Sequence, residues 1–139
     1  MANPNIVNVT SIYGNTAYVV PSTSVATPSA ANGVTSWTYN GTTALTGLTP
    51  AASSVNKIDN IVASNVSASV ATITVSINSA AAGAGTNYRL IYQLPVPVNA
   101  SVVIVDKSTA FYLGEAQSIV VTSGTTNAIE MTASYEAIT

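Results

Sequence analysis

The chain has 139 residues, three basic and five acidic side chains, a net charge of -2, and neither histidine nor cysteine. Without these two residue types there is no Ser-His-Asp or Cys-His nucleophile, no Cys or His metal site and no disulfide. Three scattered cations cannot follow a phosphate backbone, so we expect no nucleic-acid partner. No apolar run approaches the roughly 18 residues of a membrane span, so we expect no membrane partner. We also expect no cofactor, no metal ion and no catalytic residue, and therefore a protein that is not an enzyme.

The surface of this chain has to be covered by neutral polar groups. Charged residues make up only 6% of the sequence, against a usual share of about 25%. Ser, Thr and Asn together supply 49 of the 139 residues. Net charge keeps soluble monomers apart, and this chain has little of it. The composition therefore favours a subunit of an assembly, with itself as a partner in a homo-oligomer, over a free enzyme.

In chain order, the first predicted elements are two short strands. Ile6–Ile12 and Thr16–Val20 are rich in apolar and β-branched residues, and Gly14-Asn15 between them is typical of a turn. The stretch 21–54 is rich in small polar residues, and it has too few large apolar side chains to form a core of its own. We expect it to leave the β-domain as a loop or arm that carries a hairpin.

Trp37 and Tyr39 are the candidate interface residues. A hairpin formed around them places both side chains on one face, because alternate residues of a strand point the same way. Three interpretations are open: the two rings cover an open edge of the core, anchor a contact between subunits, or stack on a sugar.

The second half of the chain predicts strands by strict alternation. In Ala71–Asn78 the odd-numbered residues are apolar and the even-numbered residues polar, which is typical of a strand with one face in the core and one in water. Ile129–Ala137 repeats the pattern. Between these two lie four short segments rich in β-branched or aromatic residues: Tyr88–Leu94, Ser101–Val105, Ala110–Leu113 and Ser118–Thr122. Short strands without a 3.6-residue period predict an all-β fold, an antiparallel β-sandwich or jelly-roll-like barrel, formed by residues 1–139 as a single domain.

The predicted core consists of apolar side chains from these strands. Pro95 and Pro97 cannot donate to a sheet ladder, and they favour an edge strand or a crossing between sheets. The core residues are Ile73, Val75, Ile77, Leu90, Tyr92, Val103, Val105, Ile119, Val121, Ile129, Met131 and Tyr135.

The charged residues predict surface pairs rather than chemistry. Lys57 and Asp59 share a face of a predicted strand, Lys57–Val66, as a solvated ion pair does. Glu130 and Glu136 are six residues apart on one strand, or roughly 20 Å. That distance exceeds the roughly 5–10 Å of a glycosidase carboxylate pair. A pair drawn from different strands, Glu115 with Glu130, stays open.

Several segments of the chain, taken in order, resemble small virion structural proteins of tailed phages, particularly phages of cyanobacteria and marine bacteria. The likeness covers about Asn56–Ile138 and, more loosely, the first seventeen residues, and 21–54 has no counterpart in it. The segments are Ile12–Ala17 (IYGNTA), Lys57–Asn65 (KIDNIVASN), the alternating strand Ala71–Asn78, Val103–Leu113 (VIVDKSTAFYL) and Met131–Glu136 (MTASYE).

The resemblance implies a virion component with no catalytic residues to carry over. It suggests a capsid decoration (cement) protein that bridges and stabilises major capsid subunits, with neighbouring virion proteins as further partners. Two alternatives are a structural protein of the neck or tail, and a carbohydrate-binding module for host attachment with Trp37 and Tyr39 as its platform. A trimer is the oligomer that the resemblance and the symmetry of shells suggest.

The first residues and the stretch 21–54 lead to two further expectations, one about the place in the cell and one about the N-terminal excursion. The first residues have no basic n-region and no apolar h-region, so we expect no Sec export. A protein of the phage particle that is made in the host cytoplasm fits this expectation. The stretch 21–54 is far longer than the usual connection of about 4–6 residues. We expect it to pack on an adjacent copy or on the capsid rather than on its own sandwich.

Overall fold

The structure is a computed structural model that describes residues 8–21, 36–39 and 43–139, and of residues 36–39 and 43–46 it describes the backbone. Ten β-strands and the short 3₁₀ turn η2 (Ala81–Gly83) run through this part of the chain. The strands are β1 (Ile12–Val19), β2 (Ser36–Tyr39), β3 (Thr43–Thr46), β4 (Val55–Asn65), β5 (Ala71–Asn78), β6 (Asn87–Val96), β7 (Ser101–Val105), β8 (Phe111–Leu113), β9 (Ser118–Ser123) and β10 (Ile129–Ile138).

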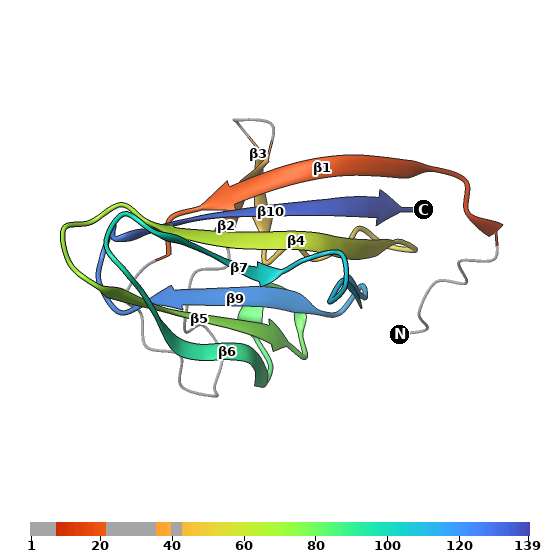
Figure 1. Ribbon diagram of the computed structural model, residues 1–139. Coiled ribbons are helices and arrows are strands. Elements are labelled where there is room, and N and C mark those ends of the chain that lie inside the picture. The colour runs from red at the N-terminus through yellow and green to blue at the C-terminus, as the bar shows by residue number, and fades with distance from the viewer. Residues whose placement is uncertain (1–7, 22–35, 40–42) are drawn as a thin grey trace.

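The strands form two antiparallel sheets that pack against each other. The large sheet has seven strands in the order β3-β2-β1-β10-β4-β7, with β8 also paired to β4, and the small sheet has the order β6-β5-β9. In Figure 1 the strands β1, β10 and β4 form the upper layer, and β9, β5 and β6 form the lower layer. The predicted all-β antiparallel sandwich is confirmed. No helix in the described ranges is long and apolar enough to cross a membrane.

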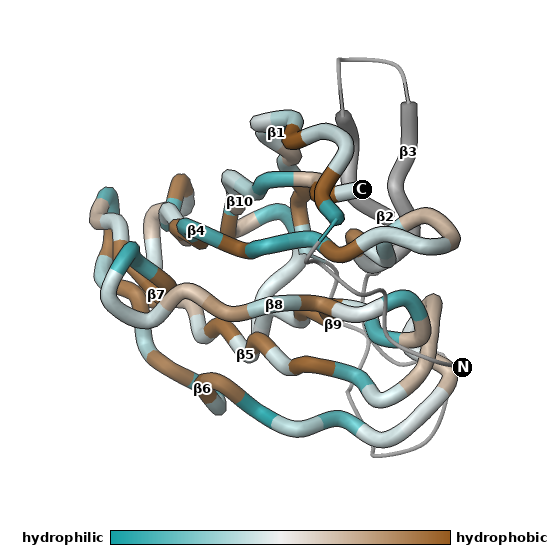
Figure 2. Tube along the Cα trace, turned by 90° about the vertical axis from the view of Figure 1, so that its right-hand side faces the viewer, coloured by the Kyte–Doolittle hydropathy of each residue, from teal (hydrophilic) through white to brown (hydrophobic). Residues whose placement is uncertain are grey.

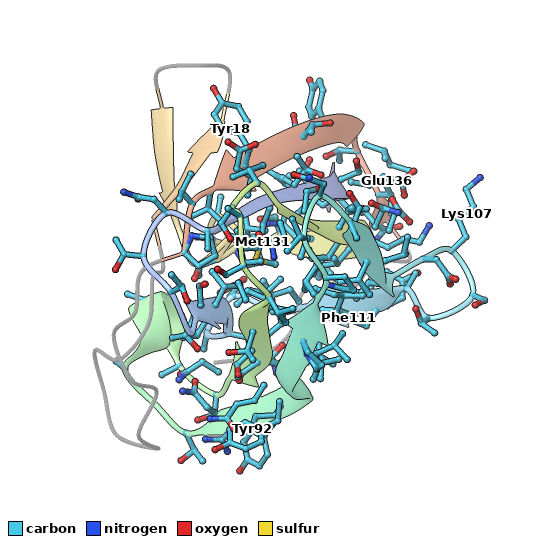
Figure 3. All side chains as sticks on the ribbon, turned by 60° about the vertical axis from the view of Figure 1, so that its left-hand side comes forward. Tyr18, Tyr92, Lys107, Phe111, Met131 and Glu136 are labelled. Carbon is cyan, nitrogen blue, oxygen red and sulfur yellow. The ribbon has the colours of Figure 1, made fainter. Side chains whose placement is uncertain are left out.

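The core lies between the two sheets and is filled by alternate side chains of each strand. On β10, Ile129, Met131 and Ala133 are at most 1% exposed, whereas Glu130 and Thr132 between them are exposed. Figure 3 shows Met131 in the middle of the molecule, and Figure 2 shows the changes between apolar and polar residues along the strands. Burying each large apolar side chain stabilises the fold by about 1.5–3 kcal/mol.

The N-terminal strand is one element rather than two. The sequence predicts a turn at Gly14-Asn15, but β1 pairs with β10 in an unbroken register from Ile12 opposite Ile138 to Val19 opposite Met131. Gly14 has no positive φ, so its backbone continues the strand. The prediction was wrong because the turn propensity of Gly-Asn is weaker than eight consecutive residue pairs along a neighbouring strand.

The polar face of β5 is buried, whereas the sequence predicts a face in water. Thr74, Ser76 and Asn78 are at most 7% exposed. The polar side chains of two of them, Thr74 and Asn78, find hydrogen-bond partners in the segments that follow β5. The Thr74 hydroxyl accepts a hydrogen bond from the backbone N–H of Gln93, and the side chain of Asn78 holds the loop that contains η2. The alternation predicted the strand correctly but not the segments that lie against its second face.

Three residues predicted for the core are exposed instead: Leu90 is 39%, Tyr92 61% and Val103 57% exposed. β6 is an edge strand whose register with β5 shifts twice, and each β-bulge adds a residue that changes which side chains face inward. Val103 lies on β7, whose register with β4 also shifts, and it pairs with Val62 on the face turned away from the small sheet. The other nine predicted core residues are buried, or partly buried in the case of Ile77.

The edge position of β6 agrees with its proline. Pro95 lies within β6, opposite Thr72 of β5, and among the described strands β6 pairs with β5 alone. Proline is tolerated there because an edge strand has one side without ladder hydrogen bonds. The expectation that Pro95 marks an edge strand is confirmed.

The described part of 21–54 packs on its own sandwich. The hairpin β2–β3 joins the large sheet through β1, with Ala17 opposite Tyr39 and Tyr18 opposite Thr38. After β3, Leu48 is fully buried in the core, and its carbonyl accepts a hydrogen bond from the Asn56 side chain at 2.8 Å. The predicted hairpin is therefore present. The expected packing of 21–54 on an adjacent copy does not hold for this part, because β1 and the core already provide its partners.

Candidate functional site

The two candidate interface residues lie on the hairpin. Trp37 and Tyr39 are both in β2, opposite Leu45 and Thr43 of β3. Alternate positions of a strand share a face, so their register agrees with the predicted hairpin. Their side chains lie outside the described residues. The three interpretations of these rings stay predictions.

The outer face of the large sheet is the broadest surface that the register brings together. It is the side of β1, β10, β4, β7 and β8 turned away from the small sheet. One row of paired residues crosses four strands, and a second row, displaced along the same strands, ends on β8. We define the outer face by these two rows and the residues between them: Tyr18, Thr132, Val62 and Val103; Thr16, Ser134 and Asn60; and Gly14, Glu136, Lys57 and Tyr112.

Neutral side chains dominate this outer face. The first row carries a phenol, a hydroxyl and two valines, and Tyr18 and Val103 at its two ends are exposed. Beyond this row, the hydroxyls of Ser64 and Ser101 bond to each other at 2.7 Å across β4 and β7. Short hydroxyl side chains lose little entropy when a partner orders them. The face can thus dock without immobilising many long charged side chains.

The charged residues of the outer face form one cluster, in which Lys57 lies between two carboxylates. The Lys57 Nζ lies 2.9 Å from Asp59 Oδ1 and 3.4 Å from Glu136 Oε2. The hydrogen bond that Lys57 donates to Asp59 raises the pKa of the lysine, and the carboxylate of Glu136 acts in the same direction. Asp59 is the extra residue of a bulge, because Ile58 and Asn60 pair with consecutive residues of β10. The predicted Lys57–Asp59 surface pair is confirmed, and Glu136 joins it.

Exposed tyrosines are the feature that the sequence reasoning missed. Among the tyrosines whose side chains are described, Tyr135 is buried and five are 45–64% exposed: Tyr13, Tyr18, Tyr88, Tyr92 and Tyr112. Figure 3 shows Tyr18 and Tyr92 projecting from opposite sides of the molecule. Aromatic rings with a polar tip are enriched where one protein docks on another. Their exposure depends on bulges and strand edges, for which the local sequence gives little sign.

On β6 a second aromatic group lies far from the outer face. The guanidinium carbon of Arg89 lies 4.9 Å from the centre of the Tyr92 ring, which is within the range of a cation–π contact. Tyr88 and Leu90 are exposed on the same strand. This edge therefore presents apolar area next to one cation.

The carboxylate pair left open by the sequence is separated in the fold. Glu130 pairs with Ser64 at one end of β4, and Glu115 accepts a hydrogen bond from the N–H of Ser53 just before the other end. Eleven residues of largely extended chain between Ser53 and Ser64 correspond to roughly 30 Å. The two carboxylates cannot act on one bond. Within the described ranges there is also no cluster of three or more carboxylates that could hold a metal ion.

A hollow of about 310 Å³ lies where β1 ends and β10 begins. Its lining includes the residues Tyr18, Glu130 and Met131. The volume is at the lower end of what small-molecule sites usually have. One acidic residue among mostly apolar lining residues does not indicate a particular ligand.

Comparison with known proteins gives no relative for this chain. No family model matches it, no curated protein matches it, and no solved structure matches it. A function has to be inferred from the sequence and the geometry of the chain itself.

Proposed function

We propose that this chain is a virion structural protein that decorates a phage capsid and bridges major capsid subunits. The observation that carries the proposal is the outer face of the large sheet: a broad sheet face of mostly neutral side chains with exposed Tyr18, Val103 and Tyr112 around a polar centre. The resemblance of the sequence to small virion proteins of tailed phages supports it. The low charge of the whole chain supports it as well.

The mechanism is additive attachment. Each copy makes a modest contact, in which tyrosine rings and valines are desolvated and serine and threonine hydroxyls exchange water for hydrogen bonds. Symmetric repetition over a shell then gives avidity, because contacts made by linked copies reinforce one another. A protein that binds only the assembled shell stabilises that shell by mass action.

The location in the virion distinguishes two versions of this proposal. A capsid decoration repeats with the symmetry of the shell, on the order of hundreds of copies, whereas a neck or tail ring holds about a dozen. Homo-oligomers of the chain, including the trimer, fit either position. The head is the version we favour, because the resemblance of the sequence suggests a capsid decoration protein first.

A second candidate function is carbohydrate binding during host attachment. The exposed rings of Tyr88 and Tyr92 on β6 favour it, since aromatic faces stack on sugars. In this version the aromatic rings that stack on the sugar come from the β6 edge as well as from Trp37 and Tyr39. Binding of the purified chain to host glycans that is lost in Tyr92→Ala would favour this function.

The test of the main proposal is to count the chain in purified particles. Quantitative mass spectrometry against the major capsid protein should give hundreds of copies per particle. About a dozen copies would move the protein to the neck or tail, and its absence from particles would refute a virion function.

A matched pair of variants tests the outer face itself. Val103→Glu places a charge on the outer face, and Leu90→Glu places the same charge on an exposed apolar position of β6. We expect Val103→Glu to lower the copy number on particles at least tenfold and Leu90→Glu to leave it unchanged. Equal effects of the two would mean that the outer face is not the attachment surface.

A further inference from the structure

The side of β1 turned away from β10 carries backbone groups that, before Ala17, pair with none of the described strands. Ser11 and Thr139 exchange both of their backbone hydrogen bonds, with N···O distances of 3.1 and 3.0 Å. They are therefore a hydrogen-bonded pair of an antiparallel ladder, in which alternate residues face the partner strand. The N–H and C=O groups of Ile12, Gly14 and Thr16 must then point away from β10, toward the open side.

No described strand covers this side of β1 over Ile12–Thr16. β2 pairs only with Ala17 and Tyr18, and Figure 1 shows β1 along the upper rim of the sandwich. Ile12 and Tyr13 are 58% and 64% exposed. We call Ile12–Thr16 the β1 edge.

The β1 edge lacks the features that protect natural sheet edges. Proteins guard such edges with charged side chains, proline or bulges. β6 shows this protection, since it has Arg89, Pro95 and two register shifts. The β1 edge has no charge and no proline, and its register with β10 is regular. An unguarded apolar edge is a template for another strand.

We propose that the β1 edge pairs with the β1 edge of a second copy, antiparallel and around a two-fold axis that passes through either Gly14 or Tyr13, because these registers place the outward-facing residues of the two copies opposite one another. The same strand offers the same alternation of donors and acceptors in both copies, so an antiparallel pair is self-complementary. The segment is uncharged, so two copies meet without like-charge repulsion. At its centre Gly14 has no side chain, and no atom lies within 4 Å of where its Cβ would be.

This inference rests on the proposed function for its setting, because it names a contact between copies of an assembling protein. A five-residue edge is small, and interfaces below about 1,200 Å² are usually weak or transient. We therefore expect a weak dimer in solution that becomes persistent where copies are held close together on a particle. Pairing extends the large sheet across two copies.

Cysteine cross-linking tests the pairing, since the natural chain has no cysteine. Residues opposite each other in antiparallel strands have Cα atoms about 4.5–5.5 Å apart, within the range of a disulfide. We expect Tyr13→Cys or Gly14→Cys to form covalent dimers under mild oxidation. The control Thr132→Cys lies on the same sheet but on β10, an interior strand, and should stay monomeric. Cross-linking of neither variant beyond the control would overturn the proposal.

A charge variant gives the second readout. Gly14→Glu leaves the fold intact, because the space above Gly14 is open, but it brings like charges together at the axis, beside the Glu136 carboxylate that lies opposite position 14 in each copy. Sedimentation equilibrium should show the wild-type mass rising toward twice the monomer with concentration, and a constant monomer mass for Gly14→Glu. A monomeric wild type at millimolar concentration, or equal dimerisation of the two proteins, would overturn the inference.

The two proposals fail separately. If the dimer forms but purified particles lack the chain, the proposed function is wrong and the edge pairing stands. If particles carry Gly14→Glu at the full copy number and the cysteine variants do not cross-link, the edge pairing is wrong and the virion function stands.

Discussion

Leu48 provides the sharpest test of how the N-terminal excursion is attached. Its side chain is fully buried in the core, although it lies in a stretch that the sequence assigns to an arm. Truncating a fully buried leucine to alanine loses the transfer free energy of its methyl groups and leaves a cavity, which together cost about 2–5 kcal/mol. We expect Leu48→Ala to lower the free energy of unfolding by about 3 kcal/mol, out of a total of about 5–15 kcal/mol for a domain.

Urea unfolding followed by far-UV circular dichroism measures this change. With a slope of about 2 kcal/mol per molar urea, a loss of about 3 kcal/mol lowers the midpoint by about 1.5 M. The control is Leu90→Ala, which removes the same atoms from a side chain that is 39% exposed on an edge strand. It should cost less than about 1 kcal/mol.

The reverse result would refute the reasoning. The sequence pattern places Leu90 in the core and Leu48 in an arm, whereas the structure reverses the two. If Leu48→Ala cost less than Leu90→Ala, the stretch after β3 would not belong to the sandwich.

Four further predictions concern stability and use the same assay. Asn78→Ala removes four hydrogen bonds around a fully buried amide and should cost at least about 3 kcal/mol; a smaller cost would mean that the loop after β5 finds other partners. Ser76→Ala should leave stability unchanged or raise it by up to about 1 kcal/mol, because the buried Ser76 hydroxyl has no partner among the described residues. On the paired strand, Ser118→Ala breaks bonds to Gly83 and Ala80 and should cost about 1–3 kcal/mol. Gly124→Ala brings a methyl group against a threonine hydroxyl of β5, whereas Gly14→Ala meets open space; the first should destabilise and the second should not, and equal effects would contradict this packing.

The strands with the clearest alternation were predicted well. The bounds of β5 agree with the predicted Ala71–Asn78, and β10 differs from the predicted Ile129–Ala137 by one residue. Alternation is a local property, since it reflects only which side chains of one strand face the core. For this reason Ile73 and Ile129 could be assigned to the core from the sequence alone.

The predictions that failed depend on pairing between distant segments. A bulge adds one residue to a strand and reverses the side to which the later side chains of that strand point, and nothing in the sequence of β6 marks the shift that exposes Tyr92. The outer face depends on register in the same way. Tyr18 and Val103 come from opposite halves of the chain, and only the pairing of four strands places them at the two ends of one row. Composition predicted a neutral surface, but not which residues gather on it.

The position of β10 between β1 and β4 has a consequence for how the protein is made. Ile138 pairs with Ile12 on one side and with Val55 on the other, so β1 and β4 cannot join until the ribosome has synthesised β10. Contacts this distant in sequence make folding slow, because a long loop must close before any of them forms. The small sheet needs only β5, β6 and β9 and can form earlier during translation. A nascent chain therefore carries neither the outer face nor a paired β1 until synthesis has passed β10, and the association with other copies that we propose has to wait for the same step.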